Sequence, residues 1–204
     1  MSQVQKGRKE ALGDLIRRYE RELYSYLRRF TGDATLAEDI FQNTFLQVLQ
    51  RAEQYQPGRA VRPWLYAIAT NLAIDALRRS ARRQAASLDR TIESQRSESA
   101  ASLVQSLEGP GKEPLETLLE KERAELVQQA LLELPESLRA VVLLAYFRGL
   151  KYKDIADILG IPVGTVKSRL HVALKRLYDL LQARLAPNSA APEPPAKPIA
   201  QEQE

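Results

Sequence analysis

The chain of 204 residues is 44% hydrophobic and 27% charged, enough to build buried cores, and its 30 Lys+Arg against 26 Asp+Glu give a net charge of +4. It has no cysteine and one histidine, which excludes a disulfide framework, a cysteine-based zinc site and a thiol nucleophile and leaves no catalytic triad to assemble. No apolar run approaches the roughly 20 residues that span a bilayer, and the first residues lack the apolar core of a signal peptide, so we expect a cytoplasmic protein.

Residues 8–83 are predicted to form a small domain of three helices. Leucine, isoleucine and aromatic residues recur at three- and four-residue steps over residues 12–30, which is the spacing of one helical face. Gly32 should end this helix, a second is expected over about residues 35–52, and a third over about residues 63–83. Residues 1–83 carry 15 basic and 9 acidic residues, a net +6, which favours a polyanionic partner.

The second predicted helix has an apolar face and a polar face. The polar face consists of Glu38, Asp39, Gln42, Asn43 and Gln50, with Leu46 exposed among them. An apolar side chain ringed by polar ones is typical of a protein interface with a central anchor. A solvated face with one stray leucine is equally allowed by the pattern.

The third predicted helix carries two stripes. One begins at Leu65 and is expected to be buried. The other occupies a narrow sector of the helical wheel and consists of Trp64, Asn71, Asp75, Arg78 and Arg82. In one interpretation Trp64 is simply part of the core. In the other, the stripe tracks a nucleic-acid strand, because aromatic rings stack on bases and arginines bind phosphates, with Tyr55 in the preceding loop as a second stacking platform.

Residues 84–120 are of a different composition. They contain 3 basic and 7 acidic residues, a net −4, and a Gly-Pro-Gly break at residues 109–111. Their isolated apolar residues are too few to build a core, so we predict a flexible acidic linker. Residues 187–204 are rich in proline and alanine and are predicted to be a disordered tail.

Residues 121–186 are predicted to form a second helical domain that contains a helix-turn-helix. Ala156 is small where two helices cross, Gly160 permits a tight turn, and Pro162 opens the second helix. The buried stripe of that second helix should consist of Val166, Leu170, Ala173, Leu174 and Leu177.

The opposite face of the same helix is polar. It consists of Lys167, Ser168, His171, Val172 and Lys175, with Arg169 and Arg176 on its flank. A helix in the major groove needs such a face, because cations bind phosphates and serine, arginine and histidine contact base edges. The alternative is an ordinary helical hairpin with a solvated basic face. For the sole histidine we expect a DNA contact and no catalysis.

Three segments, in this order, resemble the extracytoplasmic-function sigma factors, group 4 of the sigma-70 family. They are residues 37–45 (AEDIFQNTF), 63–71 (PWLYAIATN) and 163–170 (VGTVKSRL). The resemblance implies an all-α chain of two small helical domains, region 2 and region 4, joined by a flexible linker. It also implies a function: a subunit that binds core RNA polymerase and confers promoter recognition and DNA opening.

The resemblance assigns roles to particular residues. It implies that a surface binds the clamp of the largest polymerase subunit through Glu38, Asp39, Gln42, Asn43 and Leu46. It implies that the −10 element is recognised, and a flipped base captured, by Tyr55, Arg62, Trp64, Asn71, Asp75 and Arg78. It implies that the −35 element is read by Thr165, Lys167, Ser168, Arg169, His171 and Lys175. Family members often carry arginine where this chain has Val172, so the −35 sequence of a relative does not transfer.

The resemblance further implies that the rest of region 4 sits on the flap of the second-largest subunit and that an anti-sigma factor binds the protein. No cofactor and no enzymatic activity are expected. The alternative function is a stand-alone helix-turn-helix regulator, which would leave the Trp64 stripe without a role. An enzyme acting on nucleic acid is disfavoured, because Asp75 and the adjacent pair Glu38 and Asp39 are not arranged as catalytic carboxylates.

Overall fold

The structure is a computed structural model that describes residues 1–88 and 114–185. Its helices are α1 (Ser2–Gln5), α2 (Lys9–Thr31), α3 (Ala34–Gln50), α4 (Val61–Leu88), α5 (Pro114–Glu133), α6 (Glu136–Val142), α7 (Tyr152–Leu159) and α8 (Val163–Leu185). A 3₁₀ turn, η1 (Ala52–Gln54), follows α3, and a π-helical turn, η2 (Leu143–Phe147), follows α6. Neither described stretch contains a strand, and the all-α prediction is confirmed.

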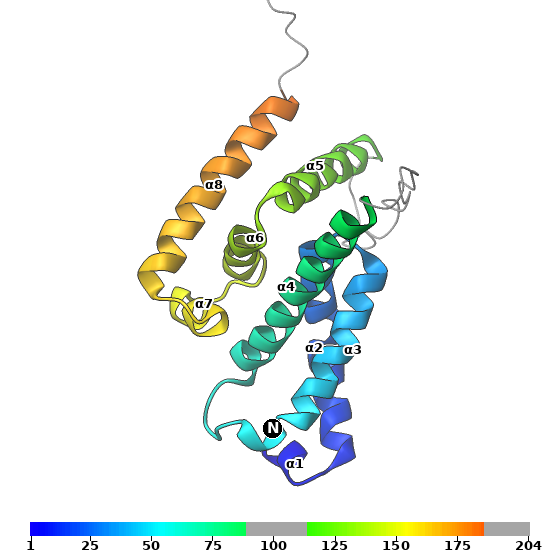
Figure 1. Cartoon of the computed structure of the whole chain (residues 1–204), viewed down its shortest axis with the longest axis vertical. Coiled ribbons are helices and arrows are strands. Elements are labelled where there is room, and N and C mark those ends of the chain that lie inside the picture. Colours follow the sequence, from blue (N-terminus) through cyan, green and yellow to red (C-terminus); the bar gives the residue numbers. More distant parts are fainter. Residues whose placement is uncertain (89–113, 186–204) are drawn as a thin grey trace, which may run out of the picture.

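Helices α2, α3 and α4 form an N-terminal bundle (Figure 1). Helix α2 ends at Gly32, whose φ of 77° is the left-handed conformation that glycine adopts without strain. Asp33 then caps α3, because its carboxylate accepts a hydrogen bond of 3.0 Å from the backbone N–H of Leu36. The turn between α2 and α3 therefore lies where the sequence predicted it.

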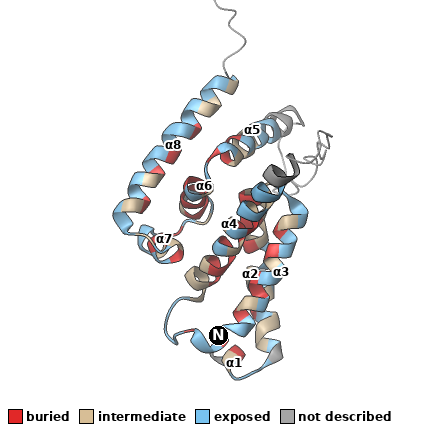
Figure 2. Cartoon of the chain, in the orientation of Figure 1, coloured by how far each residue is buried: buried red, intermediate tan, exposed pale blue. Residues whose placement is uncertain are grey.

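The core of this bundle is aromatic. Tyr26, Phe30 and Tyr66 are fully buried, and the rings of the two tyrosines meet edge to face with centroids 5.1 Å apart. The hydroxyl groups of Tyr26 and Thr70 share a hydrogen bond of 2.8 Å, which ties α2 to α4. Figure 2 shows the buried residues along the inner sides of these helices, so their outer sides remain available for contacts.

Helices α7 and α8 form the predicted helix-turn-helix. Helix α7 ends at Gly160, with φ 62°, and the N–H of Ile161 donates to the carbonyl of Ala156 at 3.1 Å. Pro162 stands just before α8, and its carbonyl accepts from the N–H of Val166 at 3.1 Å. The predicted burial of Leu174 is wrong: the residue is 39% exposed, because it lies at the edge of the stripe, beyond the helices that pack on α8.

The helices on either side of the predicted linker extend into its predicted residue range. Helix α4 continues to Leu88 and α5 begins at Pro114, so both reach inside the predicted range of 84–120. The reason is local, since alanine, glutamine, leucine and glutamate at these ends are good helix formers. Residues 89–113 of the predicted linker and the predicted tail, 187–204, lie outside the described residues.

The N-terminal and C-terminal helices pack on one another. Helix α7 lies against α4, and α5 and η2 lie against α2 (Figure 1). The side chain of Gln128 donates to the carbonyl of Arg29 at 3.0 Å. Buried Arg139 donates to the carbonyls of Phe30 and Leu132, each at 2.5 Å, and burial lowers the pKa of its guanidinium. Arg139 thus satisfies carbonyl groups that helix geometry leaves unpaired at the ends of both α2 and α5.

Candidate nucleic-acid interface

A hollow of about 400 Å³ lies between α3 and α4, on the side of α4 that carries the predicted stripe. Trp64, Asn71 and Asp75 line it from α4, one helical turn or two apart. Gln47 lines it from α3, and Arg51 lines it from the position directly after that helix. An indole, two amides, a carboxylate and a guanidinium therefore surround one small space, which is the mixture of stacking and hydrogen-bonding groups that an unpaired base requires.

Tyr55 lies beneath Trp64 and is not free to stack on a base in this arrangement. Its side chain is only 6% exposed, and its ring meets that of Trp64 edge to face with centroids 5.1 Å apart. Its hydroxyl donates to the carbonyl of Arg59, and burial raises the pKa of that hydroxyl. Trp64 itself is partly buried against Tyr55 and partly lines the hollow, so one side of its ring packs in the protein while the other faces the open space.

The two arginines predicted at the −10 element lie apart from the hollow. Arg62 forms an ion pair with Glu22 at 3.1 Å and donates to the carbonyl of Arg148 at 3.1 Å, which directs its guanidinium toward α2 and η2. Arg78 is exposed farther along α4, and its carbonyl accepts from Arg82 at 3.3 Å. The structure therefore brings together Trp64, Asn71 and Asp75, and places Arg62 and Arg78 outside them.

The predicted polar face of α3 is open to solvent over its whole length. Glu38, Asp39, Gln42, Asn43 and Leu46 are all exposed, and Leu46 has 56% of its surface exposed. Gln42 donates to the carboxylate of Glu38 at 3.0 Å, and Asn43 to the carbonyl of Asp39 at 2.8 Å. The apolar centre of this face is larger than the sequence indicated, because Leu49, one turn farther on, is 51% exposed.

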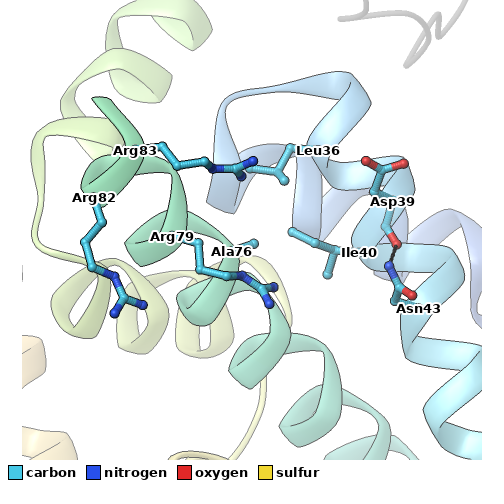
Figure 3. A pocket seen from close by; sticks show the side chains of 8 residues that line it. All are labelled: Leu36, Asp39, Ile40, Asn43, Ala76, Arg79, Arg82 and Arg83. Atoms are coloured by element: carbon cyan, nitrogen blue, oxygen red, sulfur yellow. Dashed lines mark hydrogen bonds between the residues drawn. The ribbon is translucent and has the colours of Figure 1, made fainter. Parts of the chain in front are cut away.

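A second hollow, of about 640 Å³, lies between the first half of α3 and the last described turns of α4. Figure 3 shows arginines on the α4 side and a mixed wall on the α3 side. The lining residues are Leu36, Asp39, Ile40, Asn43, Ala76, Arg79, Arg82 and Arg83. Three guanidinium groups on one wall make this end of α4 the more attractive one for phosphates.

The polar face of α8 points away from the body of the protein. Lys167, Ser168, His171 and Lys175 are exposed, while Thr165 and Arg169 are half-buried. The hydroxyl of Ser168 donates to the carbonyl of Thr165 at 3.1 Å, which is a local hydrogen bond within the same helix. The six predicted reading residues thus lie over about three turns and on adjoining sides of one helix.

The described residues offer no metal site, since no group of three or more histidine, aspartate or glutamate side chains comes together among them. Every helix within residues 1–88 and 114–185 is too short or too polar to cross a membrane.

Two family models match the chain, one on each half. The description "Sigma-70 region 2" applies to residues 15–83 and "Sigma-70, region 4" to residues 124–177. The ECF RNA polymerase sigma factor SigW of Bacillus subtilis is 32% identical over 184 residues, which is 88% of this chain and 96% of the relative. The chain belongs to the ECF sigma factors. The prediction of a sigma factor, which recognises promoters at transcription initiation, is thereby confirmed over that of a stand-alone regulator.

Other ECF sigma factors align over most of this one. The sigma-E factor of Escherichia coli K12 is 30% identical over 182 residues, covering 89% of this chain and 92% of that one. Among solved structures, CnrH in complex with the cytosolic domain of CnrY matches at a TM-score of 0.62 and 25% identity, over 89% of this chain and 94% of that one. The sigma factor RpoE of Bartonella quintana shares the fold at a TM-score of 0.65 and 23% identity, over 85% and 98% of the two chains.

Every predicted site residue of this sigma factor lies within the two segments that match region 2 and region 4. Several residues that adjoin the predicted site were not predicted from the sequence. Gln47 and Arg51 line the hollow beside Trp64, and Leu49 extends the exposed face around Leu46. Gln47, in α3, and Arg51, directly after it, are four residues apart and therefore lie on the same side. Helical spacing in the sequence could have predicted this pairing. Nothing in the sequence pointed to Arg139, whose partners lie on two different helices.

Proposed function

We propose that this sigma factor recognises a promoter with two separate surfaces. The polar face of α8 reads the −35 element through Thr165, Lys167, Ser168, Arg169, His171 and Lys175. The hollow between α3 and α4 holds a base of the −10 element that has left the duplex. The single observation that carries this proposal is that Trp64, Asn71 and Asp75, predicted from spacing alone, line one space large enough for a base.

Other predicted contacts take supporting roles in this proposal. Asn71 and Asp75 provide hydrogen-bonding groups for the edge of the base, and Trp64 provides a ring for it to stack on. Tyr55 holds Trp64 in place from below. Arg78, with the arginines at the end of α4, attracts the phosphates of the same strand. Arg62 joins this set only after it leaves Glu22, so its contact with DNA belongs to a rearranged state.

We further propose that the α3 face binds the clamp of the largest polymerase subunit, with Leu46 as its anchor and Glu38, Asp39, Gln42 and Asn43 around it. The remainder of region 4 binds the flap of the second-largest subunit. An anti-sigma factor is a further partner, of the kind that Bartonella quintana RpoE binds in its solved complex. The protein acts in the bacterial cytoplasm, where RNA polymerase works, as an initiation factor without catalysis of its own.

The division of labour between the two surfaces is testable with two variants. Lys167→Ala removes a cation from the reading face of α8, so we expect holoenzyme containing it to bind closed promoter DNA more weakly. Asn71→Ala removes a group that lines the hollow, so we expect normal closed complexes and fewer open ones. Filter binding at low temperature measures the first step, and permanganate reactivity of unpaired thymines measures the second. Arg21→Ala, which removes an exposed basic residue of α2 outside both surfaces and outside region 4, is the control. Equal losses at both steps for both variants would contradict the proposal.

A further inference from the structure

The reading face of α8 contains one aliphatic side chain among polar ones. Val172 is 43% exposed. Successive helical residues turn by about 100°, which places Val172 within about 60° of Thr165, Ser168 and Lys175 on the wheel. Its side chain therefore belongs to the same face as the residues that are proposed to read DNA.

Val172 is separate from the other apolar residues that α8 exposes. Those are Val163, Leu174, Tyr178 and Leu185. They lie at least about 120° from Val172 around the helix. Val172 is thus not the edge of a larger apolar patch, and a partner that covered the other four would leave it exposed.

The fold itself gives no reason for a valine at this position. Val172 takes no part in the hydrophobic core, and no helix of the described residues covers it. A β-branched residue is also a weaker helix former than alanine, lysine or arginine, because its side chain loses rotamer freedom against the preceding turn. An explanation therefore has to come from what the face binds.

One group in the major groove matches an aliphatic side chain. Base edges there present hydrogen-bond donors and acceptors, except for the C5-methyl group of thymine, which is apolar. Val172 can form no hydrogen bond with its side chain, and its polar neighbours serve the phosphates and the other base edges. We propose that Val172 contacts the methyl group of a thymine in the −35 element and so sets a preference for thymine at that position. The inference rests on the proposed role of α8 in reading DNA.

The expected effect is small and measurable. Burying one methyl group against an aliphatic side chain corresponds to about a fourfold change in affinity. The test uses holoenzyme assembled from core RNA polymerase and this protein, on promoter fragments selected by that holoenzyme. Each thymine of the −35 element is replaced in turn by deoxyuridine, which lacks only the methyl group.

With the native protein, we expect one of these replacements to weaken promoter binding by about fourfold. Val172→Ala should lose most of that difference at the same position. This variant removes exposed atoms and improves helix propensity, so loss of folding does not complicate the result. Leu174→Ala is the matched control, because it truncates an exposed aliphatic residue on another side of the same helix, and it should keep the native sensitivity.

Three results would overturn the inference. The native holoenzyme could bind every uracil-substituted promoter as tightly as the unsubstituted promoter, or the Val172→Ala holoenzyme could still lose affinity when the thymine methyl group is removed. The third such result is a −35 element that contains no thymine. Failure of the proposed function has a different signature. In that case the holoenzyme selects promoters without any dependence on the −35 sequence, or it selects no promoters. Either result would contradict both the proposed recognition of DNA by α8 and the inference about Val172.

Discussion

Two buried tyrosines differ in what their hydroxyl groups contact. Tyr26 shares a hydrogen bond of 2.8 Å with Thr70. The hydroxyl of Tyr66 is buried as well, but it makes no hydrogen bond of good geometry among the described residues and has the guanidinium of Arg62 as a nearby polar group. An unpaired buried polar group carries a desolvation cost, whereas a paired one is compensated. The two residues therefore contribute differently to stability although their rings pack against each other.

Removal of each hydroxyl should show this difference. Tyr26→Phe leaves the Thr70 hydroxyl unpaired in the core, and we expect it to lower the free energy of unfolding by about 1–2 kcal/mol. Tyr66→Phe removes an uncompensated group, and we expect no loss or a gain of up to about 1 kcal/mol. Urea unfolding of the full chain measures both. Equal destabilisation by the two substitutions would show that the Tyr66 hydroxyl has a partner after all.

The same hydroxyl predicts a dependence of stability on pH. Burial raises the pKa of Tyr66 from 10.0 to about 12. Because the folded state holds this proton more tightly than the unfolded state, its contribution is complete below pH 10 and is lost as the pH rises through about 12. The free energy of unfolding of the native protein should fall more steeply over that interval than that of Tyr66→Phe. Parallel curves for the two proteins would contradict this.

At the scale of single helices, the sequence predicted which residues share a helix face better than it predicted which neighbouring residues pack on that face. The stripe of Trp64, Asn71 and Asp75 follows from helical period alone, and the structure places all three around one hollow. Periodicity cannot tell which neighbour lies on a face, so the burial of Tyr55 beneath Trp64 was not foreseen. The same limit explains Arg62, whose ion-pair partner is 40 residues away in the sequence.

The exposed face of α3 yields a prediction about polymerase binding. Leu46 and Leu49 expose apolar surface on a helix that no described element covers on that side. If Leu46 is the anchor of the clamp contact, Leu46→Ser should weaken binding to core polymerase by about tenfold or more, which is the loss of about 1.4 kcal/mol typical of a central residue. Glu20→Ser is the control, because Glu20 is exposed on α2, outside the α3 face and outside region 4. An equal effect of the two substitutions would argue against a specific anchor.

At the scale of the whole molecule, the two halves lie too close together to occupy a promoter. Elements centred at −10 and −35 are separated by about 25 base pairs, or about 85 Å at 3.4 Å per pair. A compact chain of this length is only about 45 Å across. If the two proposed surfaces contact the −10 and −35 elements of one promoter, the packing of α7 on α4 and the hydrogen bond from Arg139 to Phe30, 109 residues away, must first separate. Local sequence patterns could not reveal this contact, because it joins residues so far apart in the chain.

This separation can be followed by fluorescence energy transfer, since the chain has no cysteine to compete for dyes. One dye on Arg21→Cys in α2 and one on Asp157→Cys in α7 would report on the two halves, and both positions are exposed. We expect efficient transfer in the free protein and a large loss when core polymerase and promoter DNA are added. A pair within the N-terminal half, Lys6→Cys with Arg21→Cys, should not respond. Unchanged transfer in the promoter complex would contradict the opening.

The most direct test of the account is assembly with core RNA polymerase followed by run-off transcription from a pool of genomic promoters. A sigma factor of this kind should form a stable complex with the core enzyme, and the complex should yield transcripts from a small set of promoters that share −10 and −35 sequences. Failure to bind core polymerase, together with tight binding of the isolated protein to a DNA site of its own, would contradict the account.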